Sequence, residues 1–205
     1  MSGHPVATVA GVPVSCAEVD AAETRLRAGP GAGALPAAGT GEGRQLRRWL
    51  TQLIVTRRVV AAEADARGLD PREAPTEAEL LPDVTARLEI GSIAAAVLAD
   101  PRARALFADV TADVHVTDDE VAAYHARNPL RFAAARPGEN GWRTTALAAP
   151  PLAEVRSAIA EQLCGAARRR AFRLWLHARR AELVRLAPGY EHPGDPRQPD
   201  NTHRH

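Results

Sequence analysis

Residues 44–67 read RQLRRWLTQLIVTRRVVAAEADAR, and this stretch decides the fold class of the chain. Its apolar side chains recur roughly every three to four residues, which is the spacing of one helix face. The glycine at position 68 is the expected stop of this helix. The apolar face is expected to consist of Leu46, Trp49, Leu50, Leu53, Ile54, Val60, Ala61 and Ala64.

The chain before this helix predicts a small strand unit and a second helix. Residues 6–14 alternate valine with small residues and indicate a short strand that turns at Gly11. The motif Ser15-x-x-Glu18 is a capping box that starts a helix. Residues 28–43 are rich in glycine and proline, and they predict a flexible linker. The apolar face of the short helix is expected to be Val19, Ala22 and Leu26.

The chain after the helix predicts a further helix that begins with a second capping box, Thr76-x-x-Glu79. Pro82 is compatible with this helix because it falls in the first turn. The pair Asp100-Pro101 is expected to end it. Its apolar face would be Leu80, Val84, Leu88, Ile93 and Val97.

Two shorter pieces follow. Residues 102–108 predict one or two helical turns, and residues 114–116 predict a short extended piece. A third capping box, Thr117-x-x-Glu120, starts a helix that ends near residue 128.

The last part of the body is expected to be a loop and one long helix. Residues 133–150 contain prolines, glycines and little periodicity, and they predict a loop or a small hairpin. Residues 152–186 predict a single helix with an apolar face opposite a dense arginine face. The apolar positions include Val155, Ile159, Leu163, Ala167, Phe172, Trp175, Leu176 and Val184. The arginines are Arg168, Arg169, Arg170, Arg173, Arg179, Arg180 and Arg185.

This order of elements is similar to that of a known protein family. A strand, a capped helix, a long helix ending at Gly68 and the segment VTDDEVAAYHARNPLRF at 116–132 together resemble the N-terminal region of SurA/PrsA-type chaperones. The resemblance implies a mostly α, SurA-N-like lobe that forms a single domain over residues 1–187. In that family the lobe flanks an inserted parvulin domain. Here the loop 133–150 is too short to hold one, so prolyl isomerase activity is not expected.

Composition narrows the functional classes. All 26 basic residues are arginine, so arginine is the default basic residue of this chain and its count says little. Glu161, Glu182 and acidic segments elsewhere can offset part of the arginine face, so a nucleic-acid partner is not favoured. The chain has neither a stretch of roughly 20 apolar residues nor a signal peptide, and we expect a cytoplasmic protein without a membrane partner. Cys16 and Cys164 are expected to be buried or free thiols. Serine-elbow, phosphate-loop and zinc-protease motifs are absent from the sequence.

Residues 188–205 form a proline- and histidine-rich tail that is expected to fold on the domain. Its four prolines exclude a helix, and in an extended chain residues two apart point the same way. Imidazole and carboxylate ligands suit a divalent transition metal such as Fe, Cu, Mn or Zn. The predicted metal ligands are His192, His203, His205, Asp195 and Asp200. A solvated tail with chance histidines, or a metal-free lid, would carry the same residues.

Two residue sets beside the tail complete the predicted site. His192, His177 and Tyr190 are the candidate catalytic groups, because imidazole and phenol can transfer protons. The substrate-binding candidates are Arg173, Arg180 and Trp175 on the last helix. His177 could equally be a partly buried helix residue without chemistry.

Two functions from different classes follow. The first is a small-molecule enzyme of specialised metabolism, built on the SurA-like scaffold, with a pocket completed by the tail and a metal as its cofactor. The alternative is a cytosolic peptide-binding chaperone or assembly factor that uses an apolar groove and needs no metal. A structural partner in a larger biosynthetic complex is a third interpretation.

Overall fold

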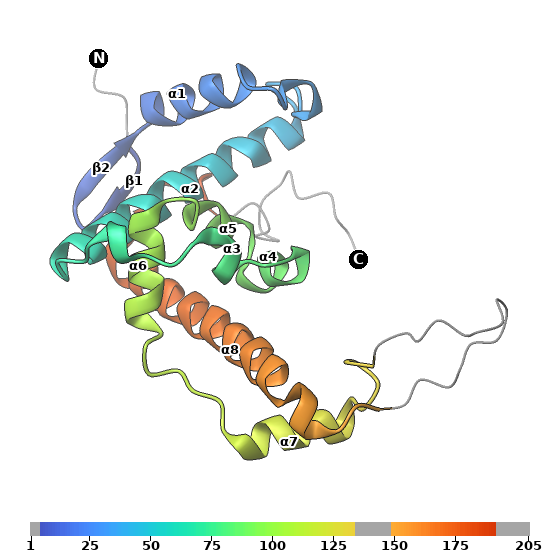
Figure 1. Cartoon of the computed structure of the whole chain (residues 1–205). Helices are drawn as coiled ribbons and strands as arrows, with labels where there is room; N and C mark the ends of the chain where they lie inside the picture. Colours follow the sequence, from blue (N-terminus) through green and yellow to red (C-terminus); the bar gives the residue numbers. More distant parts are fainter. Residues whose placement is uncertain (1–4, 134–148, 192–205) are drawn as a thin grey trace, which may run out of the picture.

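The computed structural model describes residues 5–133 and 149–191. These residues form eight α-helices, two short 3-10 helices and a three-stranded sheet, so the expected mostly helical fold with a short N-terminal strand unit is confirmed. Figure 1 shows the sheet at one end of the molecule and helix α7 at the other, with α8 running between them.

The N-terminal strand unit is a β-hairpin. Strand β1 (Pro5–Val9) pairs antiparallel with β2 (Val12–Ser15). The two residues of the turn, Ala10 and Gly11, both have positive φ, at 49° and 82°. This backbone matches the right-handed twist of the two strands and explains why the chain reverses at the glycine. The predicted turn at Gly11 is therefore confirmed.

A third strand completes the sheet and corrects one prediction. Helix α8 (Leu152–Leu183) ends three residues before the predicted end, and Val184–Leu186 form β3. Strand β3 pairs antiparallel with β1, which gives the order β2-β1-β3. Val184 therefore lies in a strand, because pairing with the free edge of β1 satisfies backbone groups that a further helical turn would have satisfied internally.

Helices α1 (Cys16–Arg27) and α2 (Gly41–Ala66) follow the hairpin. The capping box of α1 is present as predicted. The segment between the helices contains the 3-10 helix η1 (Ala32–Ala34). Residues 41–43 belong to α2 instead of the predicted linker, because Thr40 caps the helix and accepts a hydrogen bond from the Gly43 backbone N–H.

Helix α2 lies at the centre of the core. It packs against α1, α5, α6, α8 and strand β1, and side chains on several of its faces are buried. Gly68, at φ 64°, follows its end as expected. The aromatic part of the core lies where α6 meets α8, with the Phe107 and Phe172 rings 5.1 Å apart.

The segment predicted as one helix from residue 76 to residue 100 is three short helices. They are α3 (Glu77–Leu80), α4 (Val84–Ile90) and α5 (Ser92–Val97). The capping box at Thr76 is confirmed, but Pro82 ends α3 instead of continuing it. Asp83 then caps α4 by accepting a hydrogen bond from the Ala86 backbone N–H at 2.7 Å. Gly91, with φ 90° and ψ 151°, separates α4 from α5 in a conformation that is essentially restricted to glycine.

These breaks change which side chains are buried. Val84 and Leu88, predicted for the apolar face, are 71% and 75% exposed. Ala86 and Ile90 are buried in their place, because the break before α4 rotates its faces relative to α3. Ile93 and Val97 are buried as predicted.

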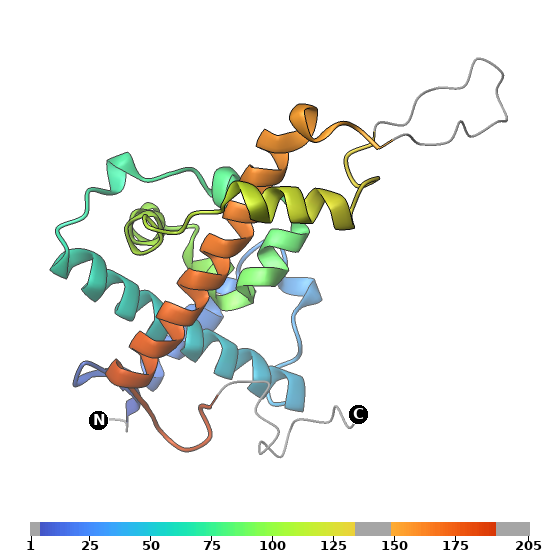
Figure 2. The ribbon, with the colours of Figure 1, turned by 90° about the horizontal axis from the view of Figure 1, so that it is seen from below.

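The remaining helices are η2 (Pro71–Glu73), α6 (Pro101–Val110), α7 (Asp118–Arg127) and α8. The break at Asp100-Pro101 and the third capping box are confirmed. Residues 114–116 carry no regular secondary structure. Helix α7 packs beside the first half of α8, as Figure 2 shows. Most of the predicted loop 133–150 lies outside the described residues. Among the described helices, none is long and apolar enough to cross a membrane.

Candidate functional site

The predicted metal ligands cannot be placed. His192, Asp195, Asp200, His203 and His205 lie outside the described residues. Within residues 5–133 and 149–191, no group of three or more histidine, cysteine, aspartate and glutamate side chains could hold a metal ion. The metal site of the tail therefore stays a prediction.

Three other predicted site residues come together in one pocket, which we call the arginine pocket. Arg173, His177 and Arg180 of α8 line it together with Leu176. The opposite wall is the junction of α4 and α5, and the volume is about 230 Å³. The wall residues are Ile90, Gly91, Ser92, Ile93 and Ala94.

Helical spacing explains why α8 presents these side chains together. Residues 173, 177 and 180 are separated by four and three positions, so they lie on one face of the helix. Leu176, next to them, is buried and anchors this face against the core. The α8 side of the pocket therefore presents two arginines and a histidine in a row, and Leu176 forms its apolar base.

The opposite wall depends on Gly91. Its backbone conformation turns the chain between α4 and α5 and places the first residue of α5, Ser92, at the pocket. The Ser92 hydroxyl accepts a hydrogen bond from the Trp49 indole Nε1–H at 3.3 Å, which ties this wall to α2. The wall is thus fixed by the central helix.

Arg180 is held by a buried glutamine on α2. Its Nη2 donates a hydrogen bond to Oε1 of Gln52, which is only 1% exposed. The Gln52 Nε2 in turn donates to the Tyr190 carbonyl at 2.8 Å. Burial lowers the pKa of the Arg180 guanidinium, because removing a charge from water disfavours the charged form. No carboxylate in the described part of the chain forms an ion pair with Arg180.

Arg173 is held at the other side of the pocket. Its Nη1 donates to the backbone carbonyl of Glu89, at the end of α4, over 3.1 Å. The Glu89 carboxylate does not neutralise it, because that group pairs with Arg169 at 2.8 Å. His177 is exposed at the pocket between the two arginines.

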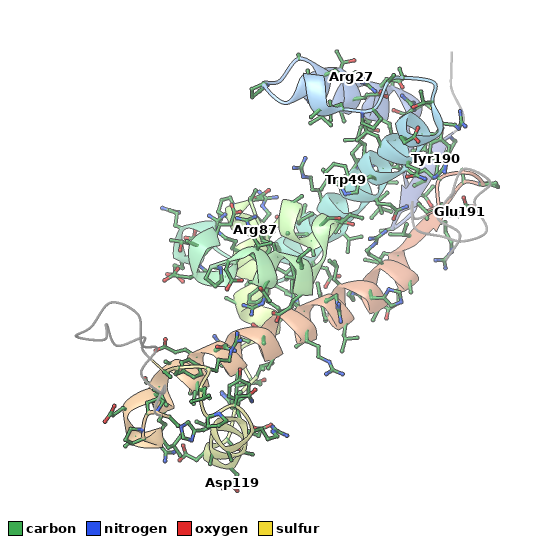
Figure 3. All side chains as sticks on the ribbon, turned by 90° about the vertical axis from the view of Figure 1, so that its right-hand side faces the viewer. Arg27, Trp49, Arg87, Asp119, Tyr190 and Glu191 are labelled. Carbon is green, nitrogen blue, oxygen red and sulfur yellow. The ribbon has the colours of Figure 1, made fainter. Side chains whose placement is uncertain are left out.

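Trp175 and the Tyr190 side chain do not share this pocket. Trp175 lies on the other side of α8, stacked on Phe172 at 5.7 Å between centroids and covered by Arg67. The Tyr190 hydroxyl is 3.7 Å from the Cys16 Sγ, near the sheet (Figure 3). Burial, together with this contact, raises the pKa of the Tyr190 phenol. Of the predicted substrate-binding and catalytic residues, Arg173, Arg180 and His177 therefore share one pocket, and the side chains of Trp175 and Tyr190 lie elsewhere.

A second hollow, which we call the apolar groove, lies between α1 and α2. It is open and about 520 Å³ in volume. Two of its sides come from the apolar faces predicted for these helices, and the third comes from the segment around η1. The lining is Leu26, Leu35, Pro36, Glu42, Gln45, Leu46 and Trp49.

Comparison with known proteins adds one local similarity. Residues 5–42 match a family model described as a family of unknown function (DUF7158). No curated protein and no solved structure matches the chain. The matched residues cover the hairpin, α1 and the segment up to the start of α2, so they include part of the apolar groove and none of the arginine pocket.

Proposed function

We propose that the protein is an enzyme that acts on a small anionic organic molecule bound in the arginine pocket. The observation that carries this proposal is the convergence of Arg173, His177 and Arg180 on one small pocket. Arginine pairs well with carboxylate and phosphate groups. An imidazole can accept or donate a proton near neutral pH, which makes His177 the candidate acid or base.

The charge balance of the pocket supports an anionic ligand. A half-buried guanidinium is costly unless an anion or strong acceptors surround it. Arg180 is half-buried and has a neutral amide as its partner, whereas Arg173 is exposed and donates to a backbone carbonyl. A bound anion would give Arg180 the countercharge that its described neighbours do not supply.

The C-terminal tail enters this proposal as the part that completes the pocket. The chain leaves β3 and reaches Tyr190, whose carbonyl shares Gln52 with Arg180. We propose that His192, His203 and His205, with Asp195 or Asp200, add acid–base groups or hold a divalent transition metal. The SurA-like scaffold, a role in specialised metabolism and a cytoplasmic location belong to the same proposal.

The test is turnover of a mixture of small organic acids. Purified protein is incubated with the mixture, and loss or conversion of each compound is followed by mass spectrometry. We expect conversion of at least one acid by the wild type, a large loss with His177→Ala and Arg180→Gln, and no change with Arg170→Gln. Arg170 is a matched control because it is an exposed arginine of the same helix outside the pocket lining. Equal conversion by wild type and His177→Ala, or no conversion at all, would contradict the proposal.

A peptide-binding chaperone or assembly factor is the second candidate, and the apolar groove favours it. Leu46 and Trp49 line an open apolar surface beside Leu26, which is 37% exposed. Such a surface can hold an extended polypeptide client through its apolar side chains.

This candidate is tested by suppression of the aggregation of a chemically unfolded model client. Leu46→Ser should weaken the suppression, and Leu174→Ser, at an exposed position outside the groove, should not. An equal effect of the two variants would remove the groove from consideration.

A further inference from the structure

The two arginines of the pocket are separated along α8. Arg173 and Arg180 are seven positions apart, which corresponds to about 10 Å along a helix axis. His177 lies between them, about 6 Å from the first and about 4.5 Å from the second by the same rise per residue. One helix face therefore offers two cationic groups with an imidazole in the middle.

Hydrogen bonds anchor the two guanidinium groups to different helices. Arg173 is bonded to the carbonyl of Glu89 on α4, and Arg180 is bonded to Gln52 on α2. The two anchors, on α4 and α2, are separate from each other in the fold. Each guanidinium has five N–H groups, and the bonds above use only one of them on each arginine.

The lining between the two arginines is partly apolar, with His177 and Ser92 as its polar members. Leu176 forms part of the α8 wall, and Ile90, Ile93 and Ala94 face it from the other side. A volume of about 230 Å³ is below the usual range for drug-sized ligands, so the pocket suits a small metabolite.

We infer that the ligand of the arginine pocket is a short dicarboxylic acid, with one carboxylate on Arg173, the other on Arg180 and its carbon chain against the apolar wall. This inference rests on the proposed function and specifies its substrate class. A monoanion would leave one guanidinium without a countercharge, whereas a dianion of matching length pairs with both. The geometry places the middle of the carbon chain next to His177.

The experiment is a binding titration, followed by NMR of the wild type and variants. The probes are succinate, glutarate, adipate and suberate, with butyrate and hexanoate as monocarboxylates of comparable chain. We expect one dicarboxylate to bind at least about tenfold more tightly than either monocarboxylate, which is about 1.4 kcal/mol for the second ion pair. Arg173→Gln and Arg180→Gln should each remove this preference, and Arg170→Gln should keep it.

The outcomes separate the inference from the proposed function. Equal affinity for dicarboxylates and monocarboxylates, with both affinities lost in Arg180→Gln, would contradict the dicarboxylate inference and keep the proposal that the pocket binds an anion. No binding of any probe would overturn both. Because removing Arg180 also removes a partner of buried Gln52, Arg180→Lys is measured alongside. This variant keeps the charge and should retain a preference for dicarboxylates, and thermal unfolding confirms that each variant is folded.

Discussion

Gln52 is the residue at which three parts of the chain meet. It lies on the buried face of α2, accepts from Arg180 of α8 and donates to the carbonyl of Tyr190 after β3. A buried amide with both ends satisfied fixes the relative position of its partners. Gln52 therefore positions Arg180 at the pocket without itself lining it.

We predict that Gln52→Leu lowers the free energy of unfolding by about 1–3 kcal/mol, because a half-buried guanidinium and a backbone carbonyl both lose a partner. Gln52→Glu should cost less, since a carboxylate still accepts from Arg180 and only the donor to Tyr190 is lost. Urea unfolding of the two variants beside wild type measures the difference. A larger loss for Gln52→Glu would contradict this account.

Glu18 gives the fold a pH dependence at the residue scale. Its pKa lies below the ordinary value of 4.5, first because the Ser15 backbone N–H donates to the carboxylate, while burial opposes the shift and Arg58 adds to it. A carboxyl whose pKa is lower in the folded state stabilises the protein above its unfolded value, and this contribution is lost as the pH falls through the folded value.

The stability of wild type should therefore fall between about pH 5 and pH 3 more steeply than that of Glu18→Gln. Urea unfolding at a series of pH values tests this. Glu23→Gln is a useful companion: burial acts to raise the pKa of Glu23, but Arg27 and Arg47 together hold this pKa below its ordinary value. Parallel pH profiles for wild type and Glu18→Gln would show that the Glu18 carboxylate does not contribute.

At the scale of elements, the sequence predicts features that depend on neighbouring residues, and it does not predict features that depend on residues far apart in the chain. All three capping boxes, at Ser15, Thr76 and Thr117, start helices as predicted, because each box is made by residues within one turn. The helix break at Gly91 was missed, since its cause is a backbone conformation that the arrangement of α4 and α5 imposes. Strand β3 was missed because its partner lies at the other end of the chain.

The same distinction applies to the candidate site. The α8 positions of Arg173, His177 and Arg180 could be predicted from helical periodicity. The wall across the pocket could not, because it depends on the bend at Gly91. Gln52 lies about 100° around α2 from Leu53, outside the predicted apolar face, so only the fold shows that it is buried and what it binds.

Strand β3 allows a prediction at this scale. A chain that ends at Leu183 lacks β3 and the Tyr190 contact, whereas a chain that ends at Glu191 keeps both. We expect the shorter chain to unfold about 5–10 °C below the longer one, from a loss of about 2–3 kcal/mol. Thermal unfolding by circular dichroism compares the two. Equal midpoints would show that β3 does not stabilise the fold.

At the scale of the whole molecule, the arginines mainly join helices to one another. Arg179 pairs with Glu63 of α2, and Arg156 pairs with Asp118 of α7 at 2.6 Å. Arg47 joins α2 to α1 through Asp20 and Glu23. Within the arginine face of α8, Arg169 pairs with Glu89 and Arg179 with Glu63. Arg173 and Arg180 donate to neutral partners, as Arg104 and Arg185 do elsewhere in the molecule.

The predicted metal site in the tail is tested on the whole protein. We expect elemental mass spectrometry of the untagged protein to find near-stoichiometric divalent transition metal, and the double variant His203→Ala/His205→Ala to lose it. His115→Ala is a control, since this exposed histidine lies between α6 and α7, outside the tail. No metal in the wild type after addition of Fe, Mn, Cu or Zn would contradict the metal prediction. Acid–base chemistry by His177 would then be the mechanism to test.

Pairing of β1 with β3 also constrains how the protein is made. Ala7 lies opposite Leu186, so the sheet joins two segments separated by nearly the whole described chain. During synthesis the hairpin emerges from the ribosome early. The edge of β1 that faces away from β2 then stays unpaired until residues 184–186 are made. An unpaired edge is a site for association between chains. Nascent chains would therefore carry an exposed edge until residues 184–186 have been made, and a factor that covers the hairpin in that interval would favour correct folding.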